Sequence, residues 1–397
     1  MMNADFDILI VGGGLVGGSL ALALGDSPLR IGLVEAQTDA ERQASPAGLR
    51  ALALSRGTTQ SLKQLGVWEA VARAAMPIRH IHVSDRGHFG KTRLHASEAD
   101  VDALGHVLVA RMLENAIKEQ VASATNLTRL CPARILGLKS GPENMFVSLK
   151  QNGESVNVAA RLCVAADGGQ STVRSLLGIE QEIRDYGQTA IVTEVHTEKP
   201  ADGTAYERFT PAGPLAFLPL ERHKSSVVWT MSGEDAANLL QSGEQEFTAS
   251  LQQAFGYWLG RITLASRPQG HPLKLIKAGS MTDQRVILIG NAMHQIHPVA
   301  GQGFNLGLRD AAVLAERIEA QVRLGGDPGD SDFLARYASA RRRDLERVIR
   351  FTDGLVRVFS SDSTPLSLAR NAALIVMDRI PAAKRLLCHH AMGYGTR

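Results

Sequence analysis

The stretch Phe6-Asp7-Ile8-Leu9-Ile10-Val11-Gly12-Gly13-Gly14-Leu15-Val16-Gly17 joins an apolar run to three consecutive glycines. The apolar run predicts a buried parallel strand, and residues 15–24 are expected to form a helix behind the glycines. A second strand is expected over residues 30–34, and Glu35 follows it directly. Strand, glycine turn, helix and strand together make a βαβ unit of about 30 residues, which predicts an α/β domain that binds a dinucleotide.

The glycines and the acid have separate tasks in such a unit. Gly12 permits the tight turn, Gly14 lets the backbone approach a pyrophosphate, and Gly17 lets the helix pack closely on the sheet. The helix N-terminus faces the phosphates, while Glu35 can accept hydrogen bonds from a ribose. An acid at this position suits an unphosphorylated ribose, so the adenosine half of NAD or FAD fits and NADP fits poorly.

A second motif lies far along the chain and follows another buried-strand pattern. It reads Ala166-Asp167-Gly168-Gly169-Gln170-Ser171-Thr172-Val173-Arg174. Taken alone, it is equally typical of an ordinary turn between a strand and a helix, in which Asp and Gly are common.

A third motif, residues 290–310, reads GNAMHQIHPVAGQGFNLGLRD. The apolar residues 285–289 before it predict a strand, and residues 307–324 predict a long amphipathic helix. The loop between them contains a proline and glycines, so its backbone N–H groups can approach a flat ligand that becomes negatively charged. A reduced flavin ring is such a ligand.

The three motifs occur in the order typical of the group A flavoprotein aromatic hydroxylases, and the chain resembles that family over essentially its full length. The resemblance implies bound FAD and reduction by NAD(P)H. It places the Asp167-Gly168 motif by the pyrophosphate, with a part in nicotinamide nucleotide use, and the loop from Asn291 to Gly303 against the ribityl chain and the isoalloxazine ring. It also suggests that Arg50 and Arg111 contact FAD, the alternative for each being a solvated surface arginine. The FAD-binding residues expected from the motifs and the resemblance are Gly12, Gly14, Gly17, Glu35, Arg50, Arg111, Asp167, Gly168, Asn291, Pro298, Gly301, Gln302, Gly303, Phe304 and Asn305.

Two features of the third motif narrow the resemblance. Asn291 stands where the family usually has aspartate, and His297 precedes Pro298. This combination is similar to the branch of ubiquinone-biosynthesis hydroxylases that acts on 2-polyprenyl-6-methoxyphenol. The amide oxygen of Asn291 can still accept a hydrogen bond from a ribityl hydroxyl, but it adds no negative charge beside the flavin.

The branch implies hydroxylation of the aromatic ring of a polyprenylated phenol through a flavin hydroperoxide, with NAD(P)H and O2 as co-substrates. Two alternatives remain: a hydroxylase for another ring position of the same pathway, and a flavin-bearing scaffold subunit among other ubiquinone-biosynthesis proteins. His297 is the candidate base for the phenol, because a histidine titrates near neutral pH. Tyr186, Phe217 and Pro219 are candidates for the substrate pocket, with a place in the sheet core as the alternative for each.

The order of the predicted elements gives a domain organisation. We expect a discontinuous, Rossmann-like FAD-binding domain of the glutathione-reductase type, made of residues 1–75, 100–180 and 280–330. A β-rich substrate domain, residues 76–99 and 181–279, is inserted into it, and residues 331–397 form a helical C-terminal region. Within that region, residues 366–387 are apolar on most faces with interspersed basic residues, which suggests either peripheral membrane contact or a helix packed on its own domain.

Composition excludes several classes of protein. The 397 residues carry a net charge of +3, too small to indicate nucleic-acid binding, and 44% of them are hydrophobic, which is typical of a globular protein. The three cysteines are widely separated and suggest no metal site. No secretory signal and no apolar run of about 18 residues is recognisable, so we expect a cytoplasmic protein, with contact at the inner membrane face still open.

Overall fold

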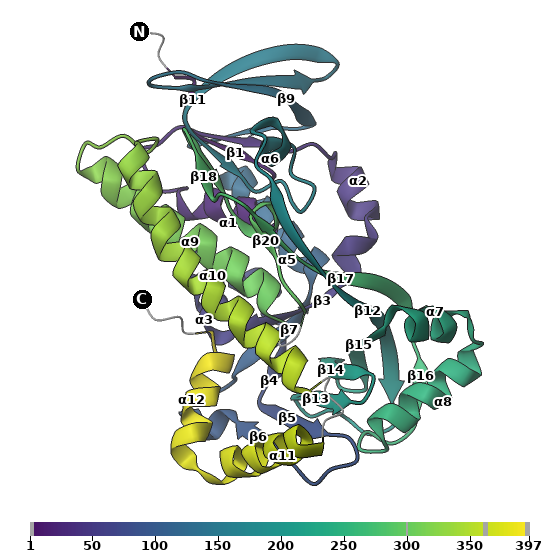
Figure 1. Ribbon diagram of the computed structural model, residues 1–397. Helices are drawn as coiled ribbons and strands as arrows, with labels where there is room; N and C mark the ends of the chain where they lie inside the picture. The colour runs from purple at the N-terminus through teal and green to yellow at the C-terminus, as the bar shows by residue number, and fades with distance from the viewer. Residues whose placement is uncertain (1–3, 299–300, 360–363, 394–397) are drawn as a thin grey trace.

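Residues 4–298, 301–359 and 364–393 are described by a computed structural model of the chain (Figure 1). Within these residues the strands form sheets of eight, nine and three strands. Helices cover the eight-stranded sheet, and the chain ends in a helical region that lies beside the nine-stranded sheet (Figure 1). The mixed α/β architecture predicted from the sequence is confirmed.

The eight-stranded sheet contains the βαβ unit. Its parallel strands run in the order β19-β11-β1-β2-β8. The strands that precede the first, second and third motifs are β1, β11 and β19, and these three are adjacent in the sheet. A hairpin of antiparallel strands extends β11, and its turn is Asn152-Gly153 with positive φ angles at both residues, as predicted. The strands are β1 (Phe6–Val11), β2 (Ile31–Val34), β8 (Leu127–Leu130), β9 (Ala133–Ser140), β10 (Met145–Gln151), β11 (Glu154–Ala165), β18 (Thr282–Asp283) and β19 (Val286–Leu288).

The nine-stranded sheet is mostly antiparallel, and it includes the alternating segment that the sequence predicts over residues 186–229. Its order is β20-β17-β12-β15-β14-β13-β5-β6, with β16 also paired to β12. The strands are β5 (His80–Asp85), β6 (Lys91–His95), β12 (Gln181–Thr197), β13 (Thr204–Thr210), β14 (Gly213–Glu221), β15 (Lys224–Ser232), β16 (Ile262–Leu264), β17 (Gln269–Ala278) and β20 (His294–Gln295).

A small sheet connects these two. It has the order β3-β7-β4, with β3 (Ala51–Ser55), β4 (Met76–Ile78) and β7 (Gly105–Val109). The helices are α1 (Leu15–Ala23), α2 (Asp39–Ala44), α3 (Arg56–Gln64), α4 (Trp68–Val71), α5 (Ala110–Ser123), α6 (Thr172–Leu176), α7 (Gly233–Gln241), α8 (Glu244–Phe255), α9 (Gln302–Arg323), α10 (Ser331–Phe359), α11 (Thr364–Arg379) and α12 (Pro381–Ala391), with 3-10 turns η1 (Pro46–Leu49), η2 (Ala96–Ala99) and η3 (Gly290–Ala292).

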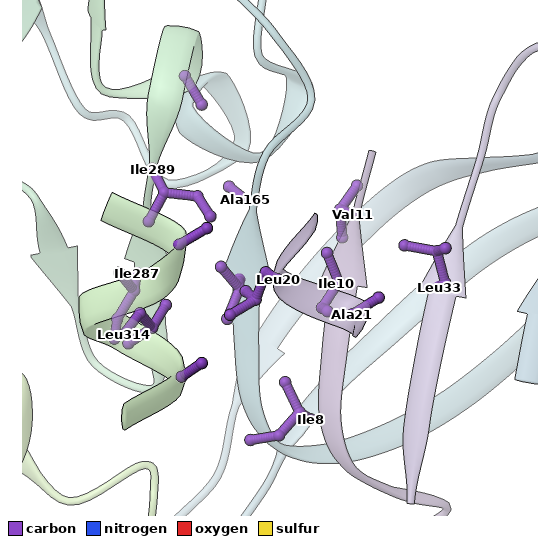
Figure 2. Packing of buried hydrophobic residues seen from close by; sticks show 14 of the residues in the cluster. Ile8, Ile10, Val11, Leu20, Ala21, Leu33, Ala165, Ile287, Ile289 and Leu314 are labelled. Carbon is purple, nitrogen blue, oxygen red and sulfur yellow. The ribbon is translucent and has the colours of Figure 1, made fainter. Parts of the chain in front are cut away.

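The main core lies between the parallel sheet and the helices that follow the first and third motifs. Leu20 of α1 and Leu314 of α9 pack on the sheet beside Ile8, Ala165 and Ile287, all of them buried (Figure 2). This shared burial fixes the N-termini of the two helices relative to one another, because both helices stand on one continuous apolar surface.

Two predicted helix boundaries are wrong. The helix expected over residues 307–324 begins at Gln302, because Gly301 adopts a positive φ of 61° as its N-cap and lets the chain enter the helix earlier. The helix expected over residues 366–387 is two helices, since Pro381 starts a new one and cannot continue the old one. The first correction puts residues 302–305 into the first turn of α9.

Candidate active site

The first glycine motif bends so tightly against the sheet that side chains have no room there. Gly12 has a φ of 101°, and a Cβ added to it would lie 2.5 Å from the backbone oxygen of Ala166. A Cβ on Gly17 would overlap the backbone oxygen of Gly12. Gly14 is the N-cap of α1, so the N–H groups of the first helical turn face outward without a capping side chain. This arrangement can bind a pyrophosphate.

Glu35 is held in one orientation at the end of β2. Its Oε2 accepts a hydrogen bond from the Gly13 N–H at 3.0 Å, and its Oε1 accepts one from the Gln37 N–H at 2.9 Å. Arg42 of α2 lies 3.3 Å from Oε2 and also donates to the Gly13 carbonyl at 2.9 Å. Each carboxylate oxygen has further lone pairs, which are available to the hydroxyls of a ribose. Arg42 was not among the predicted residues, because its role depends on α2 folding back over the glycine turn.

The second motif has a buried acceptor that fits a missing ligand. Asp167 Oδ2 accepts a hydrogen bond from the Val173 N–H at 3.2 Å, whereas Asp167 Oδ1 is buried and has no hydrogen-bond partner within the described residues. Leaving such an oxygen unsatisfied costs about 1–3 kcal/mol, so a donor from a ligand is expected there. A hydroxyl group of FAD fits this requirement.

Arg174 joins the second motif to the third. Its Nη2 donates to the Gly169 carbonyl at 2.8 Å, and its Nη1 donates to the Ala292 carbonyl at 2.7 Å. The side chain is buried. One arginine therefore fixes the distance between two loops that are more than a hundred residues apart in the chain.

The loop of the third motif is anchored by Asn305. The side-chain oxygen of Asn305 accepts hydrogen bonds from the Ser55 N–H at 3.0 Å and the Thr58 hydroxyl at 2.7 Å. Its amide nitrogen donates to the carbonyls of Ala53 and Gly301 at 2.9 and 2.8 Å. All these bonds are to the protein, so the side chain of Asn305 positions the loop, while the N–H groups at the N-terminus of α9 face outward.

A buried ionic cluster supports the same loop from behind. The Asp310 carboxylate is 2.7 Å from His294 Nε2 and 2.7 Å from Arg341 Nη2, and it accepts a hydrogen bond from the Gly290 N–H at 3.2 Å. His294 and Arg341 hold the pKa of Asp310 down, to about 2, despite its complete burial. Asp310 is the last residue of the third motif, but it was not predicted to be functional. The sequence alone does not show that its partner Arg341 lies on α10.

A cavity of about 1290 Å³ lies between these loops and the nine-stranded sheet. It brings together most of the residues predicted to bind FAD, namely Gly14, Arg50, Gly168, Asn291, Pro298, Gly301, Gln302, Gly303, Phe304 and Asn305. The remaining ones, Gly12, Gly17, Glu35, Arg111 and Asp167, are not among its lining residues, and Arg111 donates instead to the Ser45 carbonyl at 2.6 Å. The direct FAD contacts of all these residues stay predictions.

His297 is buried outside the lining of the cavity. Its ring packs edge-on against Tyr186 at 5.2 Å, and the Tyr186 hydroxyl donates to Asp353 Oδ1 at 2.5 Å. Burial lowers the pKa of His297 to about 4, although Asp353 opposes the shift. A neutral, enclosed imidazole is a weak base, so this placement does not favour the predicted direct contact of His297 with a phenol.

The expected pocket residues also lie elsewhere. Phe217 is fully buried and stacks on Phe255 at 3.8 Å, and Tyr186 and Pro219 are not among the cavity-lining residues. On β14 the cavity is lined by Pro214, Ala216 and Leu218. Phe217 and Pro219 are on the face of β14 that points away from the cavity. The sequence could not distinguish the two faces, because side chains alternate between them along a strand and both faces of β14 are apolar.

Comparison with known proteins agrees with this geometry. The family model of the FAD binding domain matches residues 5–352. Ubiquinone hydroxylase UbiL of Rhodospirillum rubrum is 39% identical over 98% of this chain and 89% of its own length. The chain belongs to the FAD-dependent hydroxylases of ubiquinone biosynthesis.

Other relatives of this hydroxylase have related names. The 3-demethoxyubiquinol 3-hydroxylase of Escherichia coli is 30% identical over 99% of this chain and all of its own length. The structure of p-nitrophenol 4-monooxygenase PnpA from Pseudomonas putida DLL-E4 superposes with a TM-score of 0.81 over 98% of both chains at 19% identity, which shows a shared fold. The enzyme is therefore an FAD-dependent aromatic monooxygenase.

Two features are absent from the described part of the chain, a membrane-spanning helix and a metal-binding cluster. No helix there combines the length and apolar character needed to cross a bilayer. Nor does that part of the chain contain a group of three His, Cys, Asp or Glu side chains suited to a metal ion.

Proposed function

We propose that the enzyme hydroxylates the ring of a polyprenylated phenol, with 2-polyprenyl-6-methoxyphenol as its substrate and NAD(P)H and O2 as co-substrates. The observation that carries this proposal is that the lining of one cavity includes the three motif loops and also an apolar face of the nine-stranded sheet. Apolar side chains such as Val192, Val228 and Leu218 suit a prenylated ring better than a charged substrate.

Residues of the motifs would hold FAD. The N–H groups after Gly14 would bind the pyrophosphate, Glu35 a ribose, and Asp167 Oδ1 a hydroxyl. Bound FAD, reduced by a nicotinamide nucleotide, supplies the activation of O2. The N-terminus of α9 would stabilise negative charge on the flavin, and the apolar side chains of the lining would limit the access of water to the reacting ring.

The test is a reconstituted reaction. The FAD-loaded enzyme is mixed with a short-chain 2-prenyl-6-methoxyphenol, O2 and either NADH or NADPH, and the product is identified by mass spectrometry. We expect one oxygen atom to be added to the ring and nucleotide oxidation to depend on the phenol. Oxidation of NAD(P)H that does not respond to any phenol would indicate the scaffold alternative. Addition at another carbon of the ring would indicate a hydroxylase for a different step.

We also propose that the enzyme works at the cytoplasmic face of a membrane, which α11 contacts. Along α11, Leu374 and Met377 line the cavity, while Ile375 and Val376 are 38% and 49% exposed. Ile380, directly after the helix, is 46% exposed. The helix lies beside the edge strand β6, where the Thr92 hydroxyl donates to the Leu374 carbonyl at 2.8 Å. One helix thus covers the cavity with one face and presents apolar side chains outward with the other, as a lipid-facing helix would.

The exposed face of α11 includes Arg379, and Arg385 is exposed on α12. These charges suit the anionic surface of a membrane. Replacing Ile375, Val376 and Ile380 together by serine is expected to weaken binding to phosphatidylglycerol vesicles by at least about tenfold, because each buried aliphatic side chain contributes about 1.5–3 kcal/mol. Vesicle co-sedimentation measures the effect. The matched control replaces Leu136, Phe146 and Val156, exposed apolar residues of the hairpin region, by serine. Equal loss of binding in both triple variants would contradict a specific role for α11.

A further inference from the structure

One carboxyl group lies within the apolar part of the cavity. The register of the nine-stranded sheet aligns seven cavity-lining residues in one row, each from a different strand. The row consists of Gln269, Val192, Val228, Ala216, Glu207, Val83 and Thr92. Glu207 is thus the one ionisable member of the row, and the residues between it and Gln269 and Thr92 at the two ends are small and aliphatic.

The next row of residues on the same face of the sheet adds further apolar side chains around Glu207. Ala205 precedes Glu207 on the same face of β13, and it is aligned with Ile81 of β5, which pairs in turn with Leu94 of β6. Helices close the other side with Phe351, Leu374, Met377, Leu387 and Ala391. None of these residues carries a charge.

Charged side chains of the adjacent strands are directed elsewhere. Arg208 lies over the ring of Trp258 at 4.9 Å, and His82 stacks on the same ring at 4.4 Å. Asp85, at the end of β5, accepts a hydrogen bond from Asn371 at 3.0 Å. The other ionisable residues of the lining are Arg50, Glu114, Glu194, Tyr206, Arg267, His271 and Lys274. Tyr206 precedes Glu207 on β13, so its side chain points to the opposite face of the strand, and Glu194 is on β12.

Burial raises the pKa of the Glu207 carboxyl to about 7, and no hydrogen bond or charge within the described residues contributes to the shift. A carboxylate in such surroundings is costly unless a donor satisfies it. The two row members paired with Glu207, Ala216 and Val83, offer no donor, and the Thr92 hydroxyl beyond Val83 already donates to the Leu374 carbonyl at 2.8 Å. The neighbours of Glu207 in the row therefore supply no hydrogen bond to its carboxylate, and the hydroxyl of a phenol can supply one.

We propose that Glu207 binds the hydroxyl of the phenolic substrate and accepts its proton, as the base of the hydroxylation. This inference rests on the proposed function, since it concerns the substrate of the same cavity. It assigns the reacting ring to the sheet row between Ala216 and Val83, with the prenyl chain along the apolar surface beside it. It also replaces His297, which lies outside the cavity lining, as the group in contact with the phenol.

The proposed step is a single proton transfer. The O–H bond of the phenol breaks while an O–H bond to a Glu207 carboxylate oxygen forms, and the electron pair left on the phenol oxygen increases the nucleophilicity of the ring. One oxygen atom that originates from O2 then bonds to the ring carbon, which loses its hydrogen as a proton. The other oxygen atom leaves as water, with the two electrons supplied by NAD(P)H; O2 and NAD(P)H both belong to the proposed activity. A base whose pKa lies near the working pH is well suited to this transfer.

The first test compares Glu207→Gln with Glu207→Asp and with Glu221→Gln, an exposed carboxyl at the end of β14. We expect Glu207→Gln to hydroxylate about 100-fold more slowly. FAD content and melting temperature should match the wild type, and the consumed O2 should appear as hydrogen peroxide. Glu207→Asp should recover part of the activity, and Glu221→Gln all of it. Hydroxylation by the wild type should rise as the pH rises through about 7, and this rise should be absent from Glu207→Gln. Unchanged hydroxylation in a folded Glu207→Gln variant would overturn the inference.

The second test needs neither turnover nor a variant that folds. Difference infrared spectroscopy of the FAD-loaded wild type should show a protonated carboxyl band that disappears through about pH 7. Adding 2-methoxyphenol as the probe should shift that titration, because the probe donates to the carboxylate. If the pH at which the carboxyl band disappears is the same with and without the probe, the inference is overturned, even if the enzyme hydroxylates a prenylated phenol. A shifted titration in an enzyme that hydroxylates no phenol would support the Glu207 site and contradict the proposed function.

Discussion

Replacing Asp310 by alanine is expected to lower the free energy of unfolding by about 3 kcal/mol, because the change removes the more buried of the two carboxylates that pair with the Arg341 guanidinium and leaves Asp344 as the other. Arg341 Nε donates to Asp310 Oδ1 at 2.8 Å, and both side chains are only a few per cent exposed. The same substitution removes the acceptor for the Gly290 N–H, so the loop at Asn291 should loosen as well. Denaturant unfolding of the FAD-free protein measures the loss.

A matched control lies on α10, the helix that contains Arg341. Glu346 and Arg350 form an exposed ion pair at 3.3 Å on α10, and Glu346→Ala should change the free energy of unfolding by less than about 1 kcal/mol. If the two alanine variants are equally stable, the buried cluster does not hold α9 and α10 together in the way described above.

Asp310 also predicts the response of stability to acid. The folded protein lowers the pKa of Asp310 from 3.8 to about 2. A carboxyl with a lowered folded-state pKa contributes its stabilisation above the unfolded-state pKa and loses it as the pH falls through the folded-state pKa. The wild type should therefore lose this contribution between about pH 4 and pH 2, whereas Asp310→Asn should have no such contribution to lose. Unfolding measured at several acidic pH values compares the two proteins.

Gly17→Ala is expected to weaken FAD binding by about 100-fold, since the loss of one or two hydrogen bonds to the charged pyrophosphate, each contributing about 1.5–3 kcal/mol, is enough for such a loss. The added Cβ would overlap the backbone oxygen of Gly12, which belongs to the turn that receives the pyrophosphate. Either α1 moves off the sheet or the turn opens, and both movements misplace the N–H groups after Gly14. Fluorescence titration of the FAD-free protein with FAD measures the affinity.

The control for Gly17→Ala is Gly137→Ala on β9. A Cβ at Gly137 meets nothing within 4 Å, and its backbone has no positive φ. FAD affinity should be unchanged in this variant. Binding of FAD by Gly17→Ala with wild-type affinity would show that α1 can move without disturbing the pyrophosphate site.

The sequence predicted the parts of the site that depend on backbone geometry. The motif glycines, Glu35 and the loop before α9 are recognisable because tight turns and close helix packing require particular residues at fixed spacing. Phe217 and Pro219 failed for a different reason: a strand that is apolar on both faces does not reveal which face borders a cavity. Glu207, Arg174 and Arg341 were not selected at all. The role of each residue depends on contacts with segments that are distant in the sequence. The strand register places Glu207 in the cavity, and the folded chain brings Arg174 to Ala292 and Arg341 to Asp310.

The order of strands in the parallel sheet also determines when the cofactor site can form during synthesis. Strands β1, β2 and β11 can pair once residue 165 has been made, but β19 and α9 complete the sheet and the flavin end of the site only when residue 323 has followed. Until then one edge of β11 lies open, and an open edge strand invites pairing with other chains. The cofactor site can therefore be complete only after residue 323 has been synthesised, and helices α11 and α12, which follow α10 in the chain, close the cavity later.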